Sequence, residues 1–136
     1  MSCSSAIYTA NTTPQELLGG SQIPFGSIVR RYGPNLDLNG FGITVRGEGY
    51  YKCDCSVTLE PTAIGEVSAQ LYVNGAPYQG AIQTGYSATA GDPVALSFPA
   101  LIRIPKCCCN DTLTLEIRLG EEGATVTNMA FTVVKI

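Results

Sequence analysis

The chain of 136 residues contains no histidine and no tryptophan, and only 14% of its residues are charged. Without histidine, the usual base that activates a serine or cysteine nucleophile is missing. The eight basic residues are scattered apart from Arg30 and Arg31, so the sequence lacks the basic stripe of a nucleic-acid-binding surface. No apolar run reaches the roughly 18 residues of a membrane-spanning helix. The sequence therefore argues against catalysis, nucleic-acid binding and a membrane anchor, and we expect no cofactor.

Acidic residues form no obvious metal site either. Glu121 and Glu122 are the densest pair, but glycines flank them, which favours a hairpin turn. Calcium binding is the alternative, although no second acidic segment with suitable spacing is present. The first ten residues lack a basic region followed by an apolar stretch, so they do not form a secretory signal. We expect synthesis in the bacterial cytoplasm, with residues 1–5 as a flexible N-terminus.

The residues that are abundant indicate an all-β fold. Fifteen glycines and eight prolines separate short runs rich in Val, Ile, Leu, Tyr and Thr. The segment 12–20 is at most a capped helical turn, and Asn74-Gly75 predicts a two-residue type I′ hairpin turn. We predict one domain over residues 1–136, built as a two-sheet antiparallel jelly roll. An immunoglobulin-type sandwich is the alternative, but the Cys…Trp…Cys spacing is missing. The predicted strands are 5–10, 23–31, 36–46, 49–60, 66–73, 76–88, 93–104, 112–120 and 125–136.

Two of these segments depart from simple alternation. In most strands one face is apolar and the other polar, as expected when one side covers a core. The segments 93–104 and 129–136 are instead apolar at both odd and even positions. We interpret the second apolar face as a subunit interface. Cover by a loop of the same chain is the alternative.

The order of these features resembles a known family. Gly49-Tyr50-Tyr51 begins a central strand, the residues 73–75 (VNG) form a hairpin, and an apolar strand ends at the C-terminus. Together with the run 23–59, this order resembles the tumour-necrosis-factor-like jelly roll that the globular heads of complement share. The similar forms are bacterial and phage proteins, including the C-terminal domain of the collagen-like glycoprotein of Bacillus spores.

The resemblance implies a compact homotrimer whose inner sheet contains the strands at 93–104 and 125–136. No collagen-like Gly-X-Y stalk precedes the domain, which favours a phage or prophage virion protein over a spore or cell-surface protein. We expect a non-enzymatic structural or adhesive component at the virion surface, such as a head fibre, decoration protein or fibre tip. Its partners would be copies of itself and other virion or surface proteins. The residues expected at the trimer interface are Phe98, Leu101, Ile102, Phe131, Val133 and Val134, joined by Tyr50 and Tyr51.

A carbohydrate- or receptor-binding module is the alternative function. Seven tyrosines could stack on sugars of a host surface if they lie on exposed loops, although packing is the more common role of a tyrosine. The seven are Tyr8, Tyr32, Tyr50, Tyr51, Tyr72, Tyr78 and Tyr86.

The six cysteines are clustered. Cys53 and Cys55 are two apart on one strand and therefore share a face, as do Cys107 and Cys109, with Cys108 facing away. The resemblance makes their two strands antiparallel neighbours, which would bring the two pairs together. Three interpretations stay open: buried free thiols, disulfides formed outside the cell, or a four-thiolate metal site of nonstandard spacing. Cys3 is far away in sequence and is expected to be free.

Overall fold

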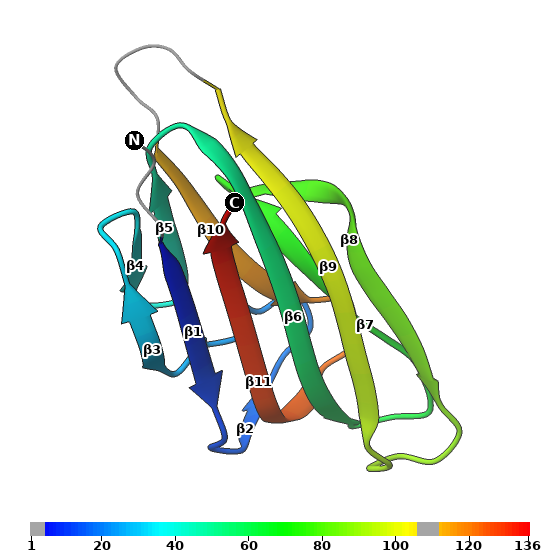
Figure 1. The fold of residues 1–136 in the computed structure, drawn as a ribbon. Coiled ribbons are helices and arrows are strands. Elements are labelled where there is room, and N and C mark those ends of the chain that lie inside the picture. The colour runs from blue at the N-terminus through cyan, green and yellow to red at the C-terminus, as the bar shows by residue number, and fades with distance from the viewer. Residues whose placement is uncertain (1–4, 106–111) are drawn as a thin grey trace.

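The computed structural model describes residues 5–105 and 112–136, and these fold into two facing β-sheets without a helix (Figure 1). Sheet A has the order β3-β1-β11-β6-β9, with the short β2 added beside β11, and sheet B has the order β4-β5-β10-β7-β8. All strand pairs are antiparallel. The predicted two-sheet jelly roll is confirmed. The strands are β1 (Ala6–Asn11), β2 (Gln15–Leu17), β3 (Ser27–Tyr32), β4 (Leu36–Asn39), β5 (Gly42–Arg46), β6 (Gly49–Pro61), β7 (Gly65–Val73), β8 (Ala76–Ser87), β9 (Val94–Ile104), β10 (Thr112–Leu119) and β11 (Ala124–Lys135).

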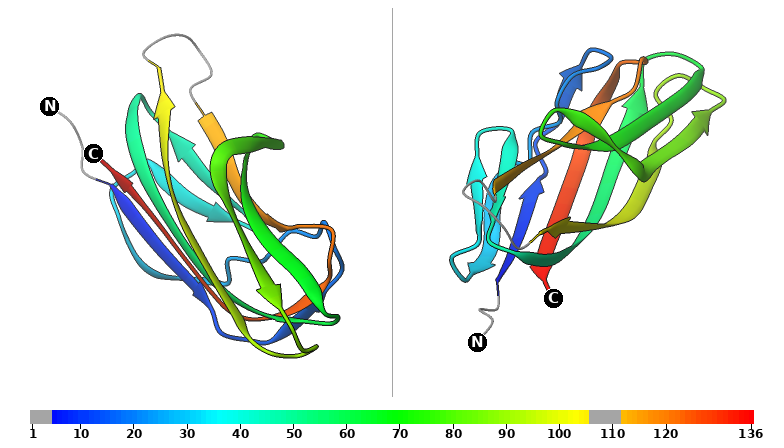
Figure 2. Two further views of the ribbon diagram at one scale, coloured as in Figure 1. Left: turned by 90° about the vertical axis from the view of Figure 1, so that its right-hand side faces the viewer. Right: turned by 90° about the horizontal axis from the view of Figure 1, so that it is seen from above.

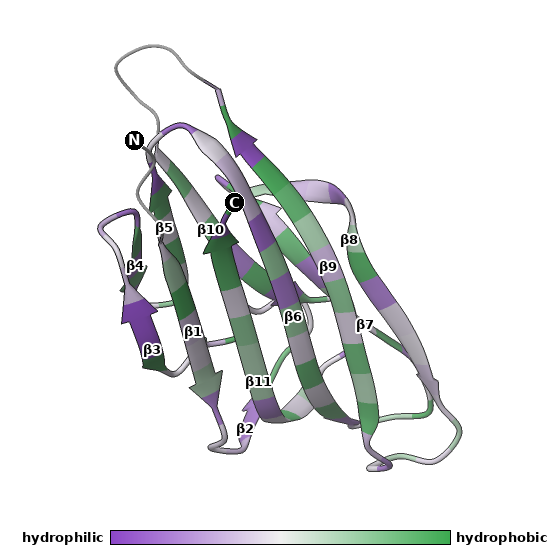
Figure 3. Cartoon of the chain, in the orientation of Figure 1, coloured by the Kyte–Doolittle hydropathy of each residue, from purple (hydrophilic) through white to green (hydrophobic). Residues whose placement is uncertain are grey.

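The two layers hold one core between them (Figure 2). Along β6 the buried side chains alternate with exposed ones, because successive residues of a strand point to opposite faces. The same alternation appears as bands of hydropathy along β6, β9 and β11 (Figure 3). Phe25 and Phe131 meet at the centre, with ring centroids 5.0 Å apart. Each large apolar side chain buried in this way contributes about 1.5–3 kcal/mol to stability.

Turn chemistry fixes where the strands reverse. Asn74 and Gly75 have φ angles of 52° and 82°, the positive values that a type I′ turn requires at both central positions, so the predicted hairpin between β7 and β8 is confirmed. Gly40 at φ 60° makes a similar reversal within the segment that we predicted as one strand, 36–46. That segment is therefore the hairpin of β4 and β5.

The segment before β3 differs from our prediction. We expected a strand from residue 23, but β3 begins only at Ser27. Ile23 and Phe25 are buried in the core, whereas β3 lies exposed at the edge of sheet A. Gly26 allows this change of direction, since its φ is 86° and a Cβ atom there would lie 2.2 Å from the carbonyl oxygen of Ala10. The segment 12–20 contains the short strand β2 and no helical turn.

Candidate assembly surface

The outer face of sheet A carries rows of side chains that run across the strands. Near the end with both chain termini, the register places Tyr32, Ala6, Val134, Lys52 and Leu101 side by side. The next row contains Arg30, Tyr8, Thr132, Asp54 and Pro99. Large apolar and aromatic groups are thus exposed along one half of this face.

The other half of the face is built from small side chains. The register aligns Ala10, Ala130, Ser56 and Ser97 in one row. The small groups leave a shallow hollow of about 400 Å³ beside Asp54 and Thr132. Another protein surface could therefore approach the sheet closely here.

The predicted interface residues divide between the two faces of sheet A. Tyr50, Leu101 and Val134 point outward, and Tyr50 and Leu101 are 47% and 52% exposed. The other five are at most 5% exposed and lie in the core of the same chain: Phe98, Ile102, Phe131, Val133 and Tyr51. A side chain that is already buried has almost no surface to bury against a second copy.

The interpretation of two fully apolar faces on β9 and β11 therefore needs correction. The outward positions of β9 are Ala95, Ser97, Pro99, Leu101 and Arg103, which form a mixed surface of mostly small side chains. On β11 they include Ala130, Thr132 and Val134. Both strands look apolar throughout in the sequence because the outward positions hold small or weakly polar residues such as Ala, Pro, Thr and Val. These residues alternate with the large apolar residues of the core. Near the chain termini, the exposed apolar side chains of sheet A and the C-terminus include Tyr8, Tyr32, Tyr50, Leu101 and Ile136.

A second uncovered region borders this face at the edge strands β8 and β9. The twelve residues of β8 include no charged side chain, and Ile82 and Tyr86 are exposed on it. Edge strands of soluble proteins are usually protected by charges, prolines or bulges, and β8 has Pro77 and a register shift only near its beginning. The long remainder of β8 is an edge that a partner could cover.

The two edge strands are fastened to each other. The Tyr78 hydroxyl donates a hydrogen bond to the Leu101 carbonyl oxygen at 2.6 Å. A Cβ atom on Gly85 would lie 2.5 Å from Val94 Cγ1, so glycine lets β8 approach β9 closely. Between these contacts and the C-terminus lies a mainly apolar hollow of about 750 Å³. Its lining includes Lys52, Tyr78, Pro99, Leu101 and Ile136.

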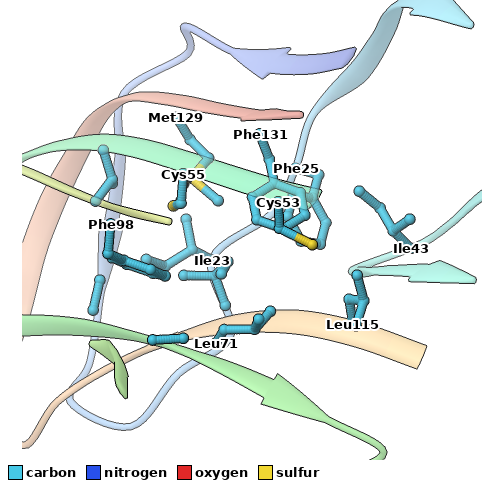
Figure 4. Close-up of a cluster of buried hydrophobic side chains, with 14 of the residues drawn as sticks. Ile23, Phe25, Ile43, Cys53, Cys55, Leu71, Phe98, Leu115, Met129 and Phe131 are labelled. Atoms are coloured by element: carbon cyan, nitrogen blue, oxygen red, sulfur yellow. Dashed lines mark hydrogen bonds between the residues drawn. The ribbon is translucent and has the colours of Figure 1, made fainter. Parts of the chain in front are cut away.

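Cys53 and Cys55 are free thiols that point into the core (Figure 4). Burial, reinforced by the charge of Asp54, raises the pKa of Cys53 to about 12. Burial and the neighbouring Cys53 raise the pKa of Cys55 to about 12 as well. Both side chains therefore stay protonated at neutral pH and act as small apolar groups, with Cys55 Sγ 4.0 Å from Met129 Sδ.

The expected meeting of two cysteine pairs does not follow from the register. Cys53 lies opposite Ala100 and Cys55 opposite Phe98, whereas β9 ends at Ile104 opposite Gly49. We had predicted that the pair on β6 lies next to the end of β9, and the register shows that it does not. Cys3, Cys107, Cys108 and Cys109 lie outside the described residues. Within residues 5–105 and 112–136, no group of three or more Cys, Asp or Glu side chains could hold a metal ion.

A buried polar cluster on sheet B was not apparent from the sequence. Glu116 is only 8% exposed and accepts hydrogen bonds from Gln22 and Arg118. The Arg118 guanidinium lies 4.4 Å from the centre of the Tyr72 ring. The cluster is structural, because it fastens the segment around Gln22 to β10.

Among the described residues, no helix is long and apolar enough to cross a membrane.

The fold is that of the tumour-necrosis-factor and complement C1q jelly rolls. No protein-family model and no curated protein matches the sequence. Among solved structures, the globular domain of zebrafish complement 1qA is similar with a TM-score of 0.70 and 11% identity, over 95% of this chain and 94% of that chain. Murine APRIL gives a TM-score of 0.67 and 13% identity, over 98% and 100% of the two chains.

A viral protein is also among the similar structures. The PRD1 vertex protein P5 gives a TM-score of 0.60 and 12% identity, over 97% of this chain and 96% of that chain. At such low identity these similarities define the fold alone. They agree with the family that the sequence resembles.

Proposed function

We propose that this chain is a non-enzymatic homotrimeric protein that serves as a structural or adhesive component of a phage or prophage virion surface. The main support is the convergence of exposed apolar side chains on the outer face of sheet A and on the adjoining β8 edge. Trimers are typical of this fold, and a phage vertex protein shares it.

The two uncovered regions suggest how copies associate. The outer face of sheet A and the β8–β9 edge are different surfaces of one chain, so contact between them is heterologous. Heterologous contacts that close produce a ring, and the threefold ring is the arrangement that the fold favours. Such a ring would cover Ile82, midway along β8 of one copy, with the outer face of sheet A of the next.

Light scattering coupled to size-exclusion chromatography tests the assembly. We expect the wild-type chain to have the mass of three copies at micromolar concentration. Leu101→Lys places a charge in the proposed contact and should yield monomers with an unchanged circular dichroism spectrum. Leu18→Lys is the matched control, because Leu18 is 80% exposed at the opposite end of the molecule and should tolerate the change. A monomeric wild-type chain would overturn the proposal.

The place of the protein on a particle needs a separate experiment. Mass spectrometry of purified virions from an induced host should detect this chain, and immunogold labelling should place it at the particle surface. Portal, capsid and tail genes beside its gene would agree with this assignment, whereas sporulation genes would favour the spore surface. Absence of the chain from purified particles would contradict the virion assignment without affecting the trimer.

Receptor binding is a second candidate, supported by Tyr86, which is 66% exposed on an uncharged strand. An aromatic ring in this position can stack on a sugar. Glycan-array binding that is lost in Tyr86→Ala but kept in Tyr32→Ala would favour it. Retained trimer mass in both variants is required, since loss of assembly would also abolish multivalent binding.

A further inference from the structure

The ionisable side chains are segregated along the long axis of the sandwich. At the end opposite the chain termini, six carboxylates lie on β2, on the end of β6, on the start of β7 and on two connecting loops (Figure 1). They are Glu16, Glu60, Glu66, Asp92, Glu121 and Glu122. In the described part of the chain, no lysine or arginine lies among them, and the nearest, Arg118, is bound by Glu116. We call this region the acidic end.

The end that carries both chain termini has the opposite charge. Arg46 lies at the end of β5, Lys52 near the start of β6, Arg103 near the end of β9 and Lys135 at the end of β11. Among the residues that the structure describes, the aromatic contact in this group is that of Arg103, whose guanidinium lies 5.6 Å from the centre of the Tyr50 ring. We call these four cations the basic end.

Few carboxylates compensate the basic end. Asp37 is held by Arg31 at 3.4 Å, which leaves two exposed carboxylates nearby among the described residues: Glu48 between β5 and β6, and Asp54, two residues beyond Lys52 on β6. Within the described ranges, the four cations of the basic end form no ion pair, and neither do the six carboxylates of the acidic end. Each chain therefore has two end surfaces of opposite charge.

We propose that the acidic end of one copy docks on the basic end of another, so that copies associate end to end. A second copy is the partner because it presents the complementary charge at the matching end of the same elongated shape (Figure 2). Contact between two different surfaces that does not close on itself extends into a linear assembly. Arg46, on sheet B, and Lys135, at the last position of β11, lie apart from the sheet face and β8 edge proposed for the trimer, whereas Lys52 and Arg103 lie on that face beside Leu101 and Tyr50. The end-to-end contact can therefore form on Arg46 and Lys135 when the face is covered. The polarity is present in each chain and does not depend on the trimer.

The strength of this contact depends on ionic strength. Exposed charges act over about 30 Å at 0.01 M salt but over only about 8 Å at 0.15 M. Association is therefore expected at low ionic strength and reverses as salt is added. In a crowded array, such as a particle surface, the same contact would act at a much higher local concentration.

Sedimentation velocity with charge-reversed variants tests the proposal. We expect the wild-type chain to shift to several-fold larger species at about 0.01 M salt and to return to its basic unit at about 0.15 M. A variant with Glu16→Lys, Asp92→Lys, Glu121→Lys and Glu122→Lys leaves only Glu60 and Glu66 as carboxylates at this end, which becomes net positive, and should abolish this shift. Arg46→Glu with Lys135→Glu should abolish it as well, because Lys52 and Arg103 are then outweighed by four carboxylates, these two with Glu48 and Asp54.

Mixing the two charge-reversed proteins is the decisive arm. Each has two ends of the same sign, so neither should associate alone, but their mixture should form the larger species. A control variant with Ser27→Lys and Thr114→Lys carries added lysines on the flanks of the sandwich and should associate like the wild type. A wild-type chain that keeps one size from low to high salt, or a mixture that stays unassociated, would overturn the proposal. The size of the basic unit at high salt reports separately on the trimer.

Discussion

Two thiols in the core give the stability of this protein a specific dependence on pH. The pKa of Cys53 and of Cys55 rises from 9.0 to about 12 on folding, because burial penalises the thiolate. A raised folded-state pKa means that the stabilisation is present in full below pH 9 and is lost as the pH rises toward 12. We expect the free energy of unfolding to fall by up to about 1.4 kcal/mol per pH unit for each thiol in this range.

Urea denaturation at a series of pH values from 8 to 10.5 measures this loss. The variant Cys53→Val with Cys55→Ala keeps the other cysteines and all seven tyrosines, so the difference between the two proteins isolates the core thiols. The wild type should lose its stability more steeply above pH 9 than the variant. Equal slopes would mean that the thiols are not buried in solution. Native wild-type protein should also react with a thiol reagent at Cys53 and Cys55 only after unfolding.

The strands differ in how well the sequence predicts them. β6, β7 and β10 alternate between apolar and polar letters, and β7 ends in Asn74-Gly75, so their existence and register follow from local pattern and turn chemistry. The segment 23–26 was mistaken for the start of a strand because Ile23 and Phe25 are two residues apart, as on one face of a strand. They belong instead to the connection before β3 and pack into the core from there. Nothing local shows that Gly26 must redirect the chain, since the group that it approaches is Ala10 of a distant strand.

The polar cluster on β10 also depends on a contact between distant segments that the local sequence does not show, and it leads to a prediction. The sequence shows Glu116 as an outward polar residue, but the segment around Gln22 covers it. Glu116→Ala would leave Gln22 and Arg118 without their acceptor in a partly buried place. We expect a loss of about 1–3 kcal/mol in the free energy of unfolding, measured by urea denaturation.

Glu121→Ala is the control for that experiment. Glu121 is exposed on the turn between β10 and β11, so its removal should change stability by less than about 0.5 kcal/mol. Hydrogen exchange should show faster exchange in Glu116→Ala at the amides of Ile23 and Leu119, which bond across this junction. Similar effects of the two substitutions would show that the cluster contributes no special stability.

For the molecule as a whole, sequence pattern indicates the sandwich better than the assembly. The apolar residues of β9 and β11 were interpreted as covering both a core and a subunit interface. The core of the single chain already buries Phe98, Ile102 and Phe131. The outward positions hold smaller residues, several of them apolar, and these form a surface of mixed polarity. Of the eight residues predicted at the interface, Tyr50, Leu101 and Val134 lie on the outer face, because successive residues of a strand point to opposite sides. The β8 edge was missed because an unprotected edge is recognisable only once the strand order is known.

If folding and assembly of this chain are linked, its thermal stability must depend on protein concentration. For a trimer that dissociates as it unfolds, mass action adds about 0.9 kcal/mol per chain for each tenfold rise in concentration. For a chain of this length, that corresponds to a rise of roughly 3 °C in Tm. Differential scanning fluorimetry over a hundredfold concentration range should show this rise for the wild type and for Leu18→Lys. Leu101→Lys should melt at a lower and concentration-independent temperature, because the charge prevents burial of the exposed face. A wild-type Tm that stays constant with concentration would show that the sandwich is stable by itself and that the exposed aromatic face contributes nothing to its stability.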